Sequence, residues 1–193
     1  MTHPPEVVLL RHGETEWSAS GRHTGRTDVS LTEQGRQQAR ALGTAVAGRH
    51  FAEVLTSPLQ RASETCRLAG LDGTVVEDVR EWDYGDHEGR TTPEIREEVP
   101  GWTVWRGPVP GGERLEDVAA RADRVVARLL EAGGDAAVVS HGHFLRVLAA
   151  RWLELPPVEG RRFALDTATV SVLGTEREAR VVRLWNAPPP LPS

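Results

Sequence analysis

The chain has 193 residues, a length that fits one domain with one sizeable core. All 23 basic residues are arginine, and with 28 acidic residues the net charge of −5 argues against a nucleic-acid partner. The lack of lysine excludes a Schiff-base lysine and a P-loop, since both need an ammonium group. The single cysteine excludes an internal disulfide, and the absence of disulfides is typical of a reducing compartment. No apolar run approaches the roughly 20 residues of a membrane span. We therefore expect a cytoplasmic protein without a membrane partner.

Short runs rich in valine and leucine alternate along the chain with segments of helical period. Four helices are expected, over Thr32–Arg49, from a Ser57-Pro58 start to Gly70, over Leu115–Ala132 and over Phe144–Leu153. Six strands are expected, over Val7–Leu10, Glu53–Thr56, Thr74–Val79, Ala136–Ser140, Val170–Thr175 and Ala179–Leu184. The proline-rich tail Pro188–Ser193 is expected to pack loosely.

This alternation predicts an α/β fold, a single three-layer domain over residues 1–193 with a largely parallel sheet and helices on both faces. In such folds ligands bind beyond the carboxyl ends of the strands. Two of the expected strands run directly into histidine, at His12 and at His141. We therefore expect these two imidazoles on the same edge of the sheet.

The segment Arg11-His12-Gly13-Glu14 follows the first strand and can meet a phosphate group. A neutral imidazole can attack phosphorus as a covalent nucleophile, and a guanidinium offers a planar fork to phosphate oxygens. A structural histidine beside a surface arginine explains the same residues. This segment by itself does not decide between the two interpretations.

Two later segments carry further charged candidates. Arg61 lies near the start of its helix, where anions bind, whereas Arg67 is expected at the surface. The segment from Arg80 to Gly89 is rich in acids, aromatics and glycine, and a carboxyl group between Trp82 and Tyr84 can be partly desolvated, as a general acid requires. An ordinary acidic loop remains the alternative.

His141-Gly142-His143 admits a metal pair or a phosphate-donor site, and the role of His143 stays open. Surface positions are expected for the three histidines His3, His50 and His87. Trp102 and Trp105 either pack a loop or wall a pocket. The arginines that can reach a second anionic group are Arg90, Arg96, Arg106 and Arg114.

Together these motifs resemble the histidine phosphatase superfamily, also called the phosphoglycerate-mutase-like family. The matching segments follow one another in family order: Leu10–Trp17, Gly21–Gly25, Leu31–Gly35, Ser57–Ala62 with Thr65, Glu81–Gly89 and His141–His143. Residues 16–18, 21–25 and 81–85 are similar to the branch of actinobacterial acid phosphatases and sedoheptulose bisphosphatases. Ser18 departs from the family pattern, in which asparagine usually follows the signature tryptophan.

The resemblance implies a metal-independent phosphomonoesterase that uses no cofactor and acts on small phosphorylated metabolites, and it points to a homodimer. It makes His12 the phosphorylated nucleophile and Glu81 the proton donor and later the base. It makes His141 a third catalytic residue, which forms the phosphate pocket with Arg11 and Arg61. It gives phosphate binding to Arg11, Arg61 and Gly142. It gives substrate contacts to Ser18, His23, Thr24, Gly25 and Tyr84.

The nearest alternative is a phosphoglycerate mutase. As the family is known, such a mutase carries a longer insert after the acid segment, with a lysine and an arginine pair that hold the substrate carboxylate. Here about 50 residues separate Gly89 from His141 and contain neither, which favours a phosphatase. A sugar bisphosphatase of the sedoheptulose bisphosphatase type, a metal-dependent hydrolase and an inactive phospho-ligand-binding module are further alternatives. The last is disfavoured because binding alone needs neither His12 nor Glu81.

Overall fold

The computed structural model describes residues 5–189, so His3 and most of the expected tail lie outside the described residues. The strands are β1 (Val7–Arg11), β2 (Glu53–Thr56), β3 (Thr74–Val75), β4 (Ala136–Ser140), β5 (Val170–Glu176) and β6 (Ala179–Ala187). The α-helices are α1 (Glu16–Ala19), α2 (Glu33–Val46), α3 (Gln60–Leu68), α4 (Thr92–Glu98), α5 (Leu115–Glu131) and α6 (Gly142–Trp152). Three 3-10 turns are η1 (Glu77–Val79), η2 (Gly85–His87) and η3 (Pro157–Arg162).

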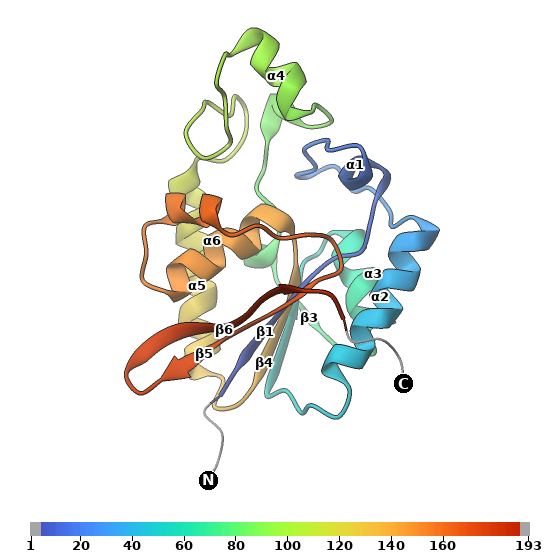
Figure 1. Cartoon of the computed structure of the whole chain (residues 1–193), viewed down its shortest axis with the longest axis vertical. Helices are drawn as coiled ribbons and strands as arrows, with labels where there is room; N and C mark the ends of the chain where they lie inside the picture. Colours follow the sequence, from blue (N-terminus) through green and yellow to red (C-terminus); the bar gives the residue numbers. More distant parts are fainter. Residues whose placement is uncertain (1–4, 190–193) are drawn as a thin grey trace.

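One six-stranded sheet organises the chain, in the order β3-β2-β4-β1-β5-β6. The first four strands in this order run parallel, and β5 and β6 are antiparallel. Helices α2 and α3 cover one face of the sheet and α5 and α6 cover the other (Figure 1). The structure is a single α/β domain with a mostly parallel sheet, which confirms the predicted fold class.

The central strands are buried on both faces, and alternate residues of β1 show this. Val7 and Leu9 pack in the cluster that contains α5 and α6, whereas Val8 and Leu10 pack in the cluster that contains α2 and α3. All four side chains are at most 3% exposed. Because both faces of the strand are covered, its sequence is a continuous apolar run rather than an alternating one.

Several predicted boundaries are wrong. Helix α2 ends at Val46 instead of Arg49, and β6 runs to Ala187 instead of Leu184. The expected strand Thr74–Val79 pairs only over two residues and then turns into η1, because its continuation carries Glu77 and Asp78 into a tight turn. Helix α3 starts at Gln60 with Leu59 at its N-cap, and the Ser57 hydroxyl lies at 3.3 Å from the Leu59 amide instead of capping the helix. Helix α6 starts two residues earlier than expected, at Gly142.

Two short helices were not predicted, and both stand above the carboxyl end of the parallel strands (Figure 1). Helix α1 is closed by a capping box in which Thr15 and Ser18 bond each other's amides. Helix α4 has the same device between Thr91 and Glu94, a spacing that the sequence displays. These helices and their loops form the roof over the edge where the two histidines lie.

Candidate active site

His12 follows directly after β1 and is 5% exposed. Its Nδ1 lies 2.7 Å from the Gly13 carbonyl oxygen. Because a carbonyl only accepts, Nδ1 carries the proton and Nε2 keeps its lone pair. Burial, followed by the charges of Arg61 and Arg11, holds the pKa of His12 well below its usual value. The ring is therefore a neutral imidazole with a free nucleophilic nitrogen.

His141 follows directly after β4, as the N-cap of α6, and lies on the same edge of the sheet as His12, as predicted. Its ring centroid lies 5.1 Å from that of His12 in an edge-to-face arrangement. Arg61 Nε donates to its Nδ1 at 3.2 Å, so Nε2 carries the proton and donates to Ser57 Oγ at 2.7 Å. Burial and then the Arg61 charge hold the pKa of His141 well below its usual value.

Arg61 is fully buried and does not line the cavity. Its Nη1 and Nη2 groups donate to the carbonyl oxygens of Thr24, Gly25 and Thr27, each at 3.0 Å. Together with the bond to His141, these contacts hold the loop over residues 24–27 against the sheet edge. Gly25 is needed there, since a Cβ would come within 2.7 Å of the Trp82 carbonyl oxygen.

Glu81 is 6% exposed, and its carboxylate lies at the N-terminal end of α6. Oε1 accepts from the amides of Trp82 at 2.9 Å and Phe144 at 2.8 Å. Oε2 accepts from the His143 amide at 3.1 Å. With two bonds Oε1 is fully occupied, whereas Oε2 retains one acceptor site. Oε2 is thus the oxygen that can exchange a proton.

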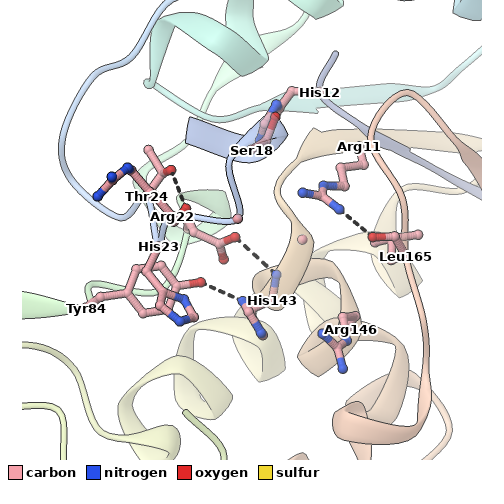
Figure 2. Close-up of a pocket in the computed structure, with 13 residues that line it drawn as sticks. Arg11, His12, Ser18, Arg22, His23, Thr24, Tyr84, His143, Arg146 and Leu165 are labelled. Atoms are coloured by element: carbon pink, nitrogen blue, oxygen red, sulfur yellow. Dashed lines mark hydrogen bonds between the residues drawn. The ribbon is translucent and has the colours of Figure 1, made fainter. Parts of the chain in front are cut away.

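Arg11 crosses the start of α6 and donates from Nη1 to the Leu165 carbonyl oxygen (Figure 2). Its Nε is buried and has no hydrogen-bond partner among residues 5–189. A Cβ on Gly142 would lie 3.2 Å from Arg11 Cζ, so glycine permits this close approach. An unpartnered buried donor next to His12 suits an anionic ligand.

His12, Glu81 and Arg11 meet at a cavity of about 140 Å³ (Figure 2). Most of the predicted site residues line it, and His141, Arg61 and Gly25 lie outside the lining. The lining residues are Arg11, His12, Ser18, Gly21, Arg22, His23, Thr24, Glu81, Tyr84, Gly142, His143, Arg146 and Leu165.

Three cavity-lining side chains, Arg22, His143 and Arg146, were not among the predicted site residues. Tyr84 Oη and His143 Nδ1 are 2.6 Å apart, which joins the acid segment to α6. The Arg146 guanidinium lies 4.8 Å from the Trp105 ring centroid and also lines the cavity, as does Arg22. The spacing of His143 and Arg146, three residues apart at the start of a helix, was the signal that could have found Arg146.

Other candidates lie elsewhere. Among the arginines expected near a second anion, Arg90 pairs with Glu98 at 2.7 Å, and none of the four lines the cavity. His87 is 5% exposed, which corrects its predicted surface position, because its ring packs 5.0 Å from that of Trp102. His50 is exposed and Arg67 is 71% exposed, both as predicted.

Within residues 5–189, no group of three or more histidine, cysteine, aspartate or glutamate side chains could hold a metal ion. In the same range, every helix is too short or too polar to cross a bilayer.

The family model described as "Histidine phosphatase superfamily (branch 1)" matches residues 7–188. The chain belongs to this superfamily. A Mycobacterium tuberculosis acid phosphatase is 45% identical, with 96% of this chain and 95% of the relative covered. A sedoheptulose 1,7-bisphosphatase from Saccharomyces cerevisiae is 34% identical over 78% of this chain and 68% of its own length. A probable phosphoglycerate mutase from Salmonella choleraesuis is 31% identical over 93% and 89%.

The solved structure of a Mycobacterium tuberculosis open reading frame superposes with a TM-score of 0.93 at 43% identity, covering 97% of this chain and 100% of that one. Membership in the histidine phosphatase superfamily and the phosphatase relatives support a phosphoric monoester hydrolase. Metal independence is consistent with the histidine phosphatase family. The likeness to the acid phosphatase and sedoheptulose bisphosphatase branch is confirmed.

Proposed function

We propose that this histidine phosphatase hydrolyses small phosphorylated metabolites through a phosphohistidine on His12, with Glu81 as the general acid and base. The observation that carries the proposal is the hydrogen bond from His12 Nδ1 to the Gly13 carbonyl, which leaves Nε2 free at the cavity that Glu81 also lines. A cytoplasmic location is part of the proposal and is supported by the single cysteine.

In the first step His12 Nε2 donates its lone pair to phosphorus while the bond from phosphorus to the ester oxygen breaks. Glu81 transfers a proton from Oε2 to the departing oxygen, so the alcohol leaves neutral. The Arg11 guanidinium is placed to bind the phosphoryl oxygens, whose charge phosphoryl transfer must stabilise. The products of this step are the free alcohol and phosphorylated His12.

In the second step water attacks the phosphorus of phosphohistidine, and Glu81, now ionised, takes the water proton. The bond between phosphorus and Nε2 breaks and its electron pair returns to His12. Inorganic phosphate leaves, and both residues regain their starting protonation states. His141 contributes through Arg61, which holds it beside His12 and holds the adjoining loop over 24–27.

The substrate class follows from the wall opposite His12. Arg22, His143 and Arg146 line the cavity in addition to Arg11. Cationic and donor groups at this place favour phosphate esters whose alcohol bears hydroxyl groups or a second anionic group. Sugar phosphates and sugar bisphosphates are such esters, in line with the similarity to a sedoheptulose 1,7-bisphosphatase.

A mutase must keep water away from its phosphohistidine. Between Tyr84 and Gly142 no residue lines the cavity, so the segment in which a mutase carries its insert adds no side chain to the cavity lining here. Hydrolysis is therefore the outcome that this site favours, and the similarity to a probable phosphoglycerate mutase does not alter that preference.

The test replaces Glu81 by glutamine and compares two leaving groups, with EDTA present throughout. The leaving group of a sugar phosphate is an alkoxide, which needs the proton from Glu81. Turnover of a sugar phosphate should therefore fall about 10²–10⁴-fold in E81Q, the usual contribution of general acid–base catalysis. p-Nitrophenolate needs no proton, so E81Q should phosphorylate His12 and stall, giving a burst of p-nitrophenol near one equivalent per site.

The matched control is Asp83→Asn, which alters a neighbouring carboxylate that is 7% exposed, pairs with Arg26 at 2.7 Å and does not line the cavity. D83N should behave as the wild type with both esters. Near wild-type turnover of both esters by E81Q, without a burst, would remove Glu81 from the mechanism.

A further inference from the structure

Arg121 is a buried arginine on α5 that lies outside the cavity. It is 5% exposed, and its guanidinium grips the Glu113 carboxylate with Nε and Nη2, each at 2.9 Å. The guanidinium also stacks over the Phe144 ring, with Cζ 5.1 Å from the ring centroid. Phe144 is the residue whose amide binds Glu81 Oε1.

The remaining donors of Arg121 all go to the main chain that carries Glu81. Nη1 donates to the carbonyl oxygens of Asp78 at 2.7 Å and Arg80 at 3.1 Å, and Nη2 lies 3.4 Å from the carbonyl oxygen of Glu81 itself. One side chain thus fixes the backbone over residues 78–81.

Glu113 extends this grip past the acid. Its Oε2 accepts from the Asp83 amide at 3.0 Å, and its carbonyl oxygen accepts from Trp82 Nε1 at 2.8 Å. The Arg121–Glu113 pair therefore holds the chain on both sides of Glu81. The carboxylate end of Glu81 is held separately, by the amides at the start of α6.

Stability alone does not explain the buried Arg121–Glu113 ion pair. Two charges lose their hydration on burial, and a buried ion pair is often no more stabilising than apolar residues of the same volume. The contacts of Arg121 to the backbone do explain it, because they position Glu81. A general acid must lie within hydrogen-bond distance of the oxygen it protonates. Holding the main chain and the carboxylate independently leaves Oε2 little freedom to move.

We propose that Arg121, acting with Glu113, is the positioning residue that holds Glu81 for proton transfer. The inference rests on the proposed role of Glu81 as proton donor. Arg121 touches no substrate, so its contribution is confined to the step in which the proton moves. Formation of phosphohistidine from an ester with a stable leaving group should proceed without it.

The experiment measures kcat/KM for a sugar phosphate and for p-nitrophenyl phosphate, because kcat/KM reports the phosphorylation step and its leaving group. Arg121→Lys keeps the charge but cannot form the fork or reach all three carbonyls. The sugar-phosphate value should fall about 10-fold or more, and the p-nitrophenyl phosphate value should stay within about twofold. Glu113→Gln keeps the size of the side chain and weakens the same ion pair. It should lower the ratio of the sugar-phosphate kcat/KM to the p-nitrophenyl phosphate kcat/KM, as R121K does. The test therefore remains possible if R121K does not fold.

The control is Arg124→Lys. Arg124 lies on the same helix and grips the same turn, but through the Asp78 carboxylate at 2.7 Å, and it is 59% exposed. R124K should leave the ratio of the two kcat/KM values unchanged. An equal fall for both esters in R121K and E113Q, as a loss of folded protein would give, overturns the inference. If E81Q itself leaves the ratio unchanged, the proposed role of Glu81 fails; if E81Q shifts the ratio and R121K and E113Q do not, only the role of Arg121 fails.

Discussion

His12 and His141 lie edge to face with their ring centroids 5.1 Å apart, and each has its proton fixed by a different partner. The Gly13 carbonyl holds the proton of His12 on Nδ1, whereas the Arg61 N–H group leaves His141 protonated on Nε2. The two rings are therefore not interchangeable. His12 keeps a lone pair on Nε2, whereas the Nε2–H group of His141 donates to Ser57 Oγ.

This difference predicts where phosphate is trapped. After rapid quenching in alkali, a wild-type sample should carry an acid-labile phosphoryl group on Nε2 of His12 and none on His141. His12→Ala should lower kcat/KM at least about 10³-fold, the scale on which nucleophile deletions act. Phosphohistidine isomers separated after digestion give the measurement. A label on Nδ1, or on His141, would contradict the assignment.

Replacing Arg61 by lysine should loosen the loop over 24–27 and destabilise the protein. Lysine keeps the charge but lacks the fork that serves three carbonyls and His141, and each buried acceptor left unsatisfied costs about 1–3 kcal/mol. We expect urea unfolding to show a loss of about 2–4 kcal/mol, together with lower phosphatase activity. Arg67→Lys, on the exposed side of α3, should stay within about 0.5 kcal/mol of the wild type. Equal stability of R61K and R67K would show that the Arg61 contacts contribute nothing.

Acid should destabilise the protein partly through His23. Burial, and then the charge of His87, lowers the pKa of His23 to about 4, against about 6.5 in the unfolded chain. Between these values the unfolded chain binds a proton that the folded one does not, so stability falls as the pH falls. His23 alone accounts for about 2 kcal/mol between pH 7 and pH 5.

The measurement compares urea midpoints of wild type and His23→Gln at these two pH values. The variant should lose less stability on acidification, because glutamine does not titrate. The buried His12 and His141, whose pKa values are also lowered, remain in both proteins and cancel in the comparison. His143 also remains, and the charge of His23 is only the third-largest cause of its lowered pKa, after burial and the charge of Arg146. Parallel losses in the two proteins would place the acid sensitivity elsewhere.

An assay with phosphoglycerates distinguishes phosphate hydrolysis from the mutase reaction. With 3-phosphoglycerate and 2,3-bisphosphoglycerate supplied together, we expect released phosphate to exceed 2-phosphoglycerate formed, because no residue between Tyr84 and Gly142 lines the cavity. Both products are followed in one coupled assay. A mutase rate well above the rate of phosphate release would reverse the proposed function.

The sequence by itself determined the layers of the fold and the edge of the sheet at which His12 and His141 lie. The continuous apolar runs Val7–Leu10 and Ala136–Ser140 can be satisfied only by burial on both faces, and each runs into a histidine. Parallel strands place their carboxyl ends together, so the meeting of His12 and His141 follows from local pattern and topology. The motifs that indicated the family include these same two histidines, His12 and His141.

Only the tertiary structure decided what surrounds those histidines. Arg61, His141 and Gly25 do not line the cavity, whereas Arg146 of α6 does. The hold of Arg121 on residues 78–81 joins a helix to a turn some 40 residues away in the sequence. Hydrogen bonds from a side chain to distant carbonyls depend on where the backbone passes and not on the identity of the residues it carries. No local pattern encodes them, because any residue presents the same carbonyl oxygen.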